Sequence, residues 1–325
     1  MPFPGHVRPG LAIVRELTGR GHEVSWYTGR AFESAVQRGG ATFVPIPSHL
    51  EPGSELWATT AKGQPASGLR KLRWDIRHGF LGTVPAYLRH LRDVFDETQP
   101  DVVVAEQGFV AAPLLAEQRD IPRVIFTVTP LSLSSEDTAP FGTGLPPATT
   151  ALGRLRNRAL NGLLRNLVFR DSQRFAAGLR SDLGLAPLDG SFLDWGASIA
   201  DRYLHATIPE FEYPRGDLPD NVEFIGALLP TDVDVWSPPP WWDDLAQAHR
   251  AGHRVVFVTQ GTVATDPGNL LLPAIRALAK DDVLLVATTG GADPDFVLPR
   301  TQRPRNLRLE TFVPFTQLLP HVDAW

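Results

Sequence analysis

The sequence predicts an α/β protein with two doubly wound, Rossmann-like domains, the first lacking its first strand and the second incomplete. Three observations indicate this class. Short runs rich in Val, Ile and Phe alternate with helical patterns along the 325 residues. Residues 102–104 are three consecutive valines, which is typical of a strand covered on both faces. A segment rich in Pro and Trp, 230–242, separates two series of such runs.

The expected N-terminal domain covers residues 1–229 and opens on a helix. Pro9 suits a first helical turn, and Leu11, Val14 and Leu17 then recur at helical spacing. The apolar runs and the Gly or Pro residues between them define the following elements. Strands are expected at 23–28, 42–46, 101–106, 123–129, 202–207 and 222–228, and helices at 31–38, 84–98, 111–118 and 152–183.

A proline-rich linker is expected at 230–249, because consecutive prolines cannot continue a helix or a central strand. The C-terminal domain is expected to cover 250–325 and to resume the α/β alternation. Its strands are expected at 255–260, 283–288 and 307–313, with a helix at 269–279.

Both ends of the chain look cut. No residues before Pro9 could form the strand that normally precedes such a helix, and Trp325 falls where another strand should begin. We therefore expect a fragment of a longer reading frame with little or no activity. A missing central strand should also leave Val102 and Val104 exposed.

Composition narrows the function classes. Hydrophobic residues make up 43% and charged residues 21%, as in ordinary globular proteins. The net charge of −5 does not favour nucleic-acid binding. No apolar run approaches the ~20 residues of a membrane-spanning helix and no leader pattern is visible, so we expect a cytoplasmic protein. Without cysteine there is no disulfide or thiolate nucleophile, and His249 and His253 lack the pattern of a metal site.

His6 is the sharpest candidate for chemistry. It lies in a Gly-His-x-x-Pro turn, and turns at the carboxyl end of strands face the ligand crevice of an α/β sheet. A histidine there can serve as a general base. Glu106 ends a predicted strand and should reach the same edge, where its carboxylate would stabilise the imidazolium. The alternative is a histidine at a helix start beside an unrelated surface glutamate.

Gly261 and Thr262 follow a strand in the second half and precede a helix that Asp266 could begin. A glycine at this point lets the backbone approach a ligand, and the free N–H groups of a helix entrance suit a diphosphate. The signal is weak by itself, because a strand-to-helix turn commonly requires a glycine for structural reasons.

Aromatic side chains in the least patterned stretch could form a binding pocket. Trp57 and Trp74 lie in this stretch and could line a pocket for a flat aromatic molecule. The alternative is that they only pack against the domain. No G-x-S-x-G nucleophile elbow occurs, so a serine hydrolase is disfavoured.

Four motifs in order resemble those of GT-B glycosyltransferases, in particular the bacterial macrolide-type and UDP-glucuronosyltransferase-like enzymes that decorate small natural products, antibiotics among them. The resemblance covers nearly the whole chain. The motifs are Pro4-Gly-His-Val-Arg-Pro9, Asp101-Val-Val-Val-Ala-Glu106, Val258-Thr-Gln-Gly-Thr262 and Phe312-Val-Pro-Phe-Thr-Gln-Leu-Leu-Pro-His-Val-Asp323.

The resemblance implies an inverting, metal-independent transferase that needs no cofactor beyond a nucleotide-sugar co-substrate. A UDP- or dTDP-sugar donor would bind the C-terminal domain at Gly261, Thr262 and Phe315. A small hydroxylated acceptor of macrolide, polyketide, flavonoid or glycolipid type would bind the N-terminal domain. The histidine matching His6 would deprotonate the acceptor hydroxyl, and the carboxylate matching Glu106 would steady that histidine.

Three departures from the family pattern stand out. Glu106 replaces the usual aspartate, and Phe315 stands where many members have Gln. The segments that wrap the donor phosphates and read the sugar would come after Trp325. Two other functions compete with transfer: a nucleotide-sugar epimerase, and a non-catalytic helper of a partner glycosyltransferase. The sequence identifies neither the sugar, the acceptor nor the oligomeric state.

Overall fold

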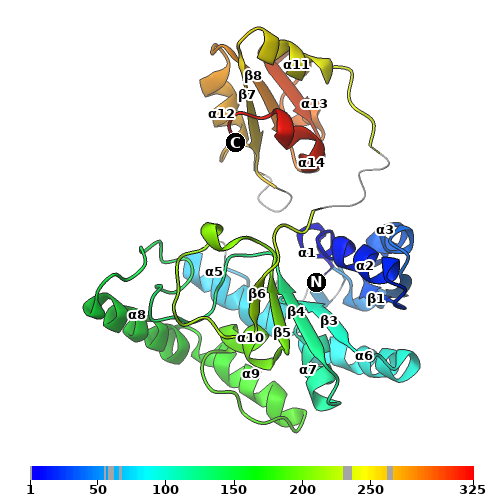
Figure 1. Cartoon of the computed structure of the whole chain (residues 1–325), viewed down its shortest axis with the longest axis vertical. Coiled ribbons are helices and arrows are strands. Elements are labelled where there is room, and N and C mark those ends of the chain that lie inside the picture. The colour runs from blue at the N-terminus through cyan, green and yellow to red at the C-terminus, as the bar shows by residue number, and fades with distance from the viewer. Residues whose placement is uncertain (1, 55, 58–61, 66–67, 230–235, 262–265) are drawn as a thin grey trace. The chain divides into compact units, whose positions relative to one another are not determined.

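The computed structural model describes residues 2–54, 56–57, 62–65, 68–229, 236–261 and 266–325 (Figure 1). The chain divides into two compact units, Met1–Leu228 and Leu229–Trp325. Every strand pair among the described residues is parallel. The predicted α/β class is therefore confirmed.

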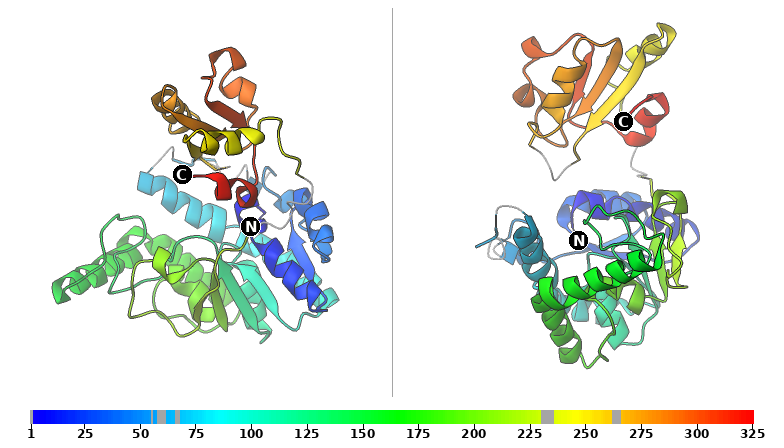
Figure 2. Two further views of the ribbon diagram at one scale, coloured as in Figure 1. Left: turned by 45° about the horizontal axis from the view of Figure 1, so that its top comes forward. Right: turned by 90° about the vertical axis from the view of Figure 1, so that its left-hand side faces the viewer.

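The first unit contains two separate parallel sheets (Figures 1 and 2). A two-stranded sheet pairs β1 (Ser25–Thr28) with β2 (Thr42–Pro45). A four-stranded sheet has the order β3 (Val103–Glu106), β4 (Arg123–Thr127), β5 (Arg202–His205) and β6 (Val222–Phe224). Each strand lies within the expected segment but is shorter, because the ladder ends where turn backbone begins. Glu106 pairs in register with Phe126 at the carboxyl end of β3.

Packing explains where the helices of the first unit form. For example, α6 buries Tyr87, Leu91 and Phe95 at helical spacing in the large core of this unit. The helices are α1 (Pro4–Val7), α2 (Gly10–Gly19), α3 (Glu33–Arg38), α5 (Gly68–Trp74), α6 (Val84–Thr98), α7 (Ala111–Gln118), α8 (Ala151–Leu163), α9 (Arg170–Asp182) and α10 (Trp195–Ile199). Two π-helices, η3 (Asp75–Leu81) and η4 (Leu164–Val168), continue α5 and α8.

Among the described residues, β1 pairs only with β2. Strand β3 is an edge strand of the large sheet and pairs only with β4. The side chains of Val102 and Val104 are 50% and 39% exposed, as expected from the sequence. A second, small core of Val14, Val36 and Ala41 serves the β1–β2 sheet and is distinct from the large core. The first unit therefore has two cores of unequal size, and Tyr27 of β1 and Ile46 after β2 pack into the large core.

The second unit is a three-stranded parallel sheet in the order β7 (Arg254–Thr259), β8 (Val283–Thr288) and β9 (Leu307–Glu310). Ala324 forms an isolated parallel bridge with Val256 at the free edge of β7. The helices of this unit are α11 (Asp243–Arg250), α12 (Leu271–Leu278), α13 (Pro294–Val297) and α14 (Phe315–Leu318). None of the described helices is long and apolar enough to cross a membrane.

Two expectations about local structure were wrong. The expected linker at 230–249 includes helix α11, because Asp243 and Asp244 favour a helix start and Leu245 and Ala248 are buried against the sheet. Its residues 230–235 lie outside the described part of the chain. The expected turn around His6 is instead the short helix α1, which begins at Pro4, a favourable first helical residue.

Candidate active site

The structure brings His6 and Glu106 together. His6 lies on α1, and Glu106 ends β3 at the carboxyl edge of the large sheet. The His6 Nδ1 atom lies 3.0 Å from the Glu106 Oε2 atom. At this distance Nδ1 faces the carboxylate without hydrogen-bond geometry, and the contact becomes an ion pair only when the imidazole is protonated. Nδ1 therefore faces a carboxylate, and Nε2 is the ring nitrogen that can take up a proton.

The local backbone fixes the Glu106 carboxylate. Its side chain is only 7% exposed, and its Oε2 atom accepts a hydrogen bond from the Gly108 backbone N–H at 3.0 Å. The His6 side chain is 27% exposed and so remains accessible to a small molecule. A buried acid behind a half-exposed imidazole is the arrangement that orients a general base and stabilises its protonated form.

A cavity of about 250 Å³ opens beside this pair, entirely within the first unit. Its walls are mostly apolar and come from η3, from the start of α7 and from α10. The lining residues are His6, Ile76, Phe80, Leu81, Glu106, Gln107, Gly108, Val110, Pro113, Ile125, Thr129, Phe192, Leu193, Trp195, Gly196 and Ile199. An apolar cavity with one acid–base pair at its wall suits an apolar molecule that carries a hydroxyl group.

Tyr203 supports the wall of this cavity. It is fully buried, and its hydroxyl donates a hydrogen bond to Gln107 Oε1. Burial raises the pKa of Tyr203, so the phenol keeps its proton and remains a donor. A Cβ atom added to Gly196 would lie 2.8 Å from Tyr203 Cε2. Only glycine lets α10 approach the Tyr203 ring this closely.

Gly196→Ala is therefore expected to lower the free energy of unfolding by about 1–3 kcal/mol, because the Tyr203 ring or α10 must shift. Thermal unfolding measures this effect. Gly178→Ala is the matched control: Gly178 lies in α9 and a Cβ atom there meets nothing within 4 Å. That control should be neutral or stabilising by up to about 1 kcal/mol. Equal melting temperatures for the two variants would contradict the close-approach argument.

The two tryptophans expected in the acceptor pocket lie elsewhere. Trp57 packs edge-on against Phe3, with ring centroids 5.6 Å apart, and its Nε1–H donates to the Leu50 carbonyl. Trp74 packs on His78 at 4.1 Å and lines a different cavity. Neither lines the cavity beside His6.

Sequence reasoning missed Trp195, the tryptophan that does line this cavity. It lies in a short helix without a readable period. The available signal was the capping box of Ser191 and Asp194, which marks a helix start just before Trp195.

The second unit presents glycines at the carboxyl edge of its sheet. Gly261 follows β7 and has φ +77°, whereas Gly290 and Gly291 follow β8 with φ +71° and +132°. Parallel strands bring these turns to one edge. Thr262 lies outside the described residues. The Gly290–Gly291 pair was missed, although two consecutive glycines after an apolar strand are a usable signal for close backbone approach.

Phe315 starts α14 and packs edge-on against Phe257, with ring centroids 5.4 Å apart, so much of its side chain belongs to the core of the second unit. Asp266 does not begin a helix, because α12 starts at Leu271. Gln260 instead caps that helix, since its Oε1 atom accepts a hydrogen bond from the Leu271 N–H at 2.8 Å.

Comparison with known proteins identifies the family. Residues 4–126 match the glycosyltransferase family 28 N-terminal domain. The 4'-demethylrebeccamycin synthase of Lentzea aerocolonigenes is 40% identical over 324 residues, which cover 99% of this chain and 75% of that protein. The chain belongs to the GT-B glycosyltransferases. UDP-glycosyltransferase 2 of Phaeomoniella chlamydospora is 30% identical over 342 residues and is covered to 73%.

Solved structures agree with this fold. The glycosyltransferase of kitacinnamycin aligns with 99% of this GT-B glycosyltransferase and 72% of its own chain, at a TM-score of 0.66 and 22% identity. The glycosyltransferase VinC, solved in complex with dTDP, aligns with 99% and 72% at a TM-score of 0.59 and 19% identity. At these identities the likeness shows the fold alone. The predicted glycosyltransferase fold is confirmed.

Proposed function

We propose that this glycosyltransferase moves a sugar from a UDP- or dTDP-sugar to a hydroxyl group of a small, largely apolar natural product, with inversion at the anomeric carbon. The carrying observation is the His6–Glu106 pair, 3.0 Å apart at the wall of an apolar cavity. The relatives support this class: one is a 4'-demethylrebeccamycin synthase and another a UDP-glycosyltransferase.

In the proposed reaction, the acceptor lies in the cavity with its hydroxyl at His6 Nε2. Nε2 takes the hydroxyl proton while the oxygen attacks the anomeric carbon, because an alcohol is a poor nucleophile until its proton leaves. The new glycosidic C–O bond forms as the bond to the diphosphate oxygen breaks, and the nucleoside diphosphate leaves with the electron pair. Glu106 stabilises the imidazolium through Nδ1 and touches no reacting atom.

The donor is proposed to bind at the glycine edge of the second unit. Backbone N–H groups near Gly261, Gly290 and Gly291 could approach a diphosphate closely, since no side chain intervenes. Thr262 and Phe315 remain proposed donor contacts, and the Phe257 packing limits Phe315 to an edge contact. No metal ion or resident cofactor is part of the proposal.

Slow turnover is also proposed. No backbone ladder among the described residues joins the β1–β2 sheet to the β3–β6 sheet, so strand pairing does not fix the helix that carries His6 relative to Glu106. A loosely held base spends less time in the productive geometry.

The direct test incubates the chain with radiolabelled UDP- and dTDP-sugars and a panel of phenols, flavonoids and macrolides, without added metal. Slow formation of a glycoside with inverted anomeric configuration, measured by NMR, is the expected result. A product that retains the donor configuration would contradict the single-displacement mechanism. A strict requirement for a divalent cation would contradict the metal-independent mechanism.

A further inference from the structure

Helix α8 and its continuation η4 turn a row of leucine side chains outward. Leu152, Leu155, Leu163 and Leu167 are 75%, 57%, 47% and 65% exposed. Their spacing places them on one side of the helix, because residues three or four apart lie one above the other. A surface helix normally buries such a row against the core. We call these four residues the leucine row.

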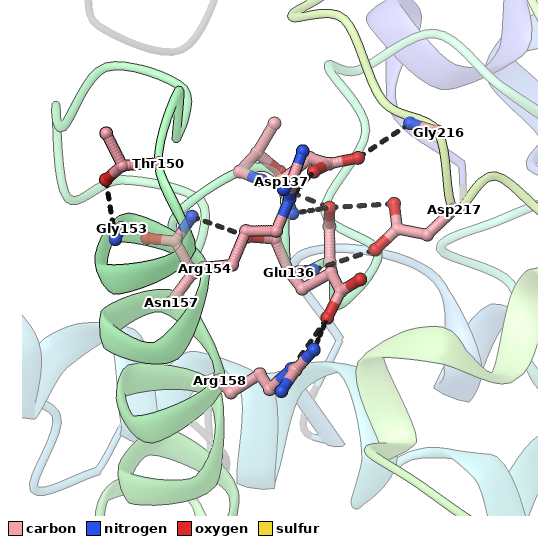
Figure 3. A network of polar contacts seen from close by, with 11 residues as sticks. Glu136, Asp137, Thr150, Gly153, Arg154, Asn157, Arg158, Gly216 and Asp217 are labelled. Atoms are coloured by element: carbon pink, nitrogen blue, oxygen red, sulfur yellow. Dashed lines mark hydrogen bonds and ion pairs between the residues drawn. The ribbon is translucent and has the colours of Figure 1, made fainter.

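The opposite side of α8 is polar and faces the protein (Figure 3). Asn157 is fully buried, and its Nδ2 atom donates to the Glu136 carbonyl at 2.9 Å. Arg154 donates from Nε to Asp137 Oδ1 at 2.8 Å, and Arg158 donates to Glu136 Oε2 at 2.6 Å. These hydrogen bonds and ion pairs attach α8 to the loop that contains Glu136 and Asp137, whereas Leu164 and Val168 of η4 pack against the large core.

Further hydrogen bonds fix the loop beside α8 that carries Glu136 and Asp137 (Figure 3). Asp137 Oδ2 accepts from the Gly216 N–H, and Asp217 Oδ2 accepts from the Glu136 N–H, both at 2.7 Å. The hydrogen bond from Arg154, followed by that from Gly216, lowers the pKa of Asp137 and keeps it ionised. Rolling α8 over to hide the leucine row would leave buried polar groups unpaired. The outward orientation is therefore built into the fold.

The surroundings of the leucine row are basic. Residues 151–170 contain five arginines and no aspartate or glutamate, in a protein whose net charge is −5. Arg165 and Arg170 pair with no carboxylate in the described part of the chain. Figures 1 and 2 show α8 projecting at the edge of the first unit. Since Asp137 and Glu136 neutralise Arg154 and Arg158, the positive charge beside the row comes from Arg156, Arg165 and Arg170.

The neighbouring helix α5 repeats this pattern. Leu69 and Leu72 are 53% and 49% exposed, and Arg70, Lys71 and Arg73 lie among them. Helix α5 and the π-helix η4 border one cavity of about 350 Å³. That cavity is lined by Pro65, Arg70, Arg73, Trp74, Arg77, His78, Val168, Asp171 and Ser172. Its cationic side chains outnumber its single carboxylate, as expected for a site that accepts an anionic group.

We propose that α5, α8 and η4 form a docking surface for an anionic phospholipid membrane, with the leucine row inserted among the acyl chains and the arginines at the phosphate groups. A flat lipid interface accepts a protruding basic helix with apolar side chains without any matching groove. A second copy of the chain is disfavoured, because pairing two such helices would bring arginine against arginine. The basic cavity between α5 and η4 would hold a lipid phosphate.

The test is co-sedimentation of the full chain with vesicles of phosphatidylcholine alone, or of phosphatidylcholine mixed with phosphatidylglycerol. The wild-type protein is expected to bind the mixed vesicles, and added salt should weaken this binding because the ionic part is screened. Leu152→Ser/Leu155→Ser/Leu163→Ser is expected to lower the bound fraction at least about tenfold. Circular dichroism checks that this variant is folded.

Matched controls distinguish docking through this surface from nonspecific hydrophobic binding to vesicles. Phe211→Ser/Leu270→Ser/Phe296→Ser removes three other apolar side chains, 83%, 47% and 89% exposed, and should bind like the wild type. Arg156→Glu/Arg165→Glu/Arg170→Glu should lose binding to the mixed vesicles.

Four results would overturn the proposal. In the first, the wild-type protein binds neither kind of vesicle. In the second, the two serine variants lose vesicle binding to the same extent. The wild type could be a dimer that the leucine variant converts to a monomer, which would make the surface an interface between copies. Inorganic phosphate at low concentration could abolish binding, which would indicate a site for a soluble anion. None of these readouts uses sugar transfer, so they stand or fall separately from the proposed function.

Discussion

His6→Asn is expected to lower the rate of sugar transfer by about 10²–10⁴-fold, the contribution of a positioned general base. Asparagine keeps a polar side chain on α1 but cannot accept the hydroxyl proton. The variant should still bind an apolar acceptor, because most of the cavity wall is unchanged. Single-turnover transfer of a radiolabelled sugar, together with acceptor titration by tryptophan fluorescence, measures both properties.

Three comparison variants sharpen this prediction. His22→Asn changes an exposed histidine after α2 and should leave the rate unchanged. Glu106→Asp keeps the carboxylate and should retain more activity than Glu106→Gln, which keeps the size but loses the charge beside His6 Nδ1. Wild-type rates in His6→Asn would rule out the base role.

Arg180→Met is expected to lower the free energy of unfolding by roughly 3 kcal/mol. The Arg180 side chain is only 2% exposed. Its Nη1 and Nη2 atoms each lie 2.7 Å from a different carboxylate oxygen of Glu117, and its Nε atom donates to the Ala186 carbonyl at 2.7 Å. Methionine fills a similar volume but leaves a mostly buried carboxylate and a carbonyl without their donor.

Urea denaturation measures this loss, and two variants test its cause. Arg180→Met/Glu117→Gln removes the stranded charge and should recover part of the stability. Arg119→Met breaks an ion pair with Asp96 whose side chains are 30% and 67% exposed, and should cost less than about 1 kcal/mol. Similar losses for Arg180→Met and Arg119→Met would contradict a special role for the buried pair.

The fold was predictable where periodicity and burial agree. Helices α6 and α7 and strand β8 have the expected bounds. In each of them a clear apolar pattern is flanked by residues that favour turns. Helix α11 was not predicted, since the prolines and tryptophans before it suggested a linker and its packing against β7 is not readable from local sequence. Helix α1 was missed because four residues carry no period.

The same distinction applies to the candidate site. The His6–Glu106 contact was predicted because the carboxyl ends of parallel strands converge on one edge, a rule that needs only strand positions. The cavity wall was not, since η3 and α10 reach it through tertiary packing across long sequence separations. Trp57 and Trp74 were chosen by residue type, and residue type does not determine which cavity a ring enters.

The two separate sheets of the first unit have a consequence for the candidate base. His6 lies on α1, directly before α2, whereas Glu106 ends β3 of the large sheet. No described backbone hydrogen bond of a strand ladder joins the two sheets, so side-chain packing sets their separation: Tyr27 of β1 and Ile46 and Leu50 after β2 pack with the large core. A substitution that loosens this shared packing is therefore expected to lengthen the contact between His6 and Glu106 and to slow proton transfer.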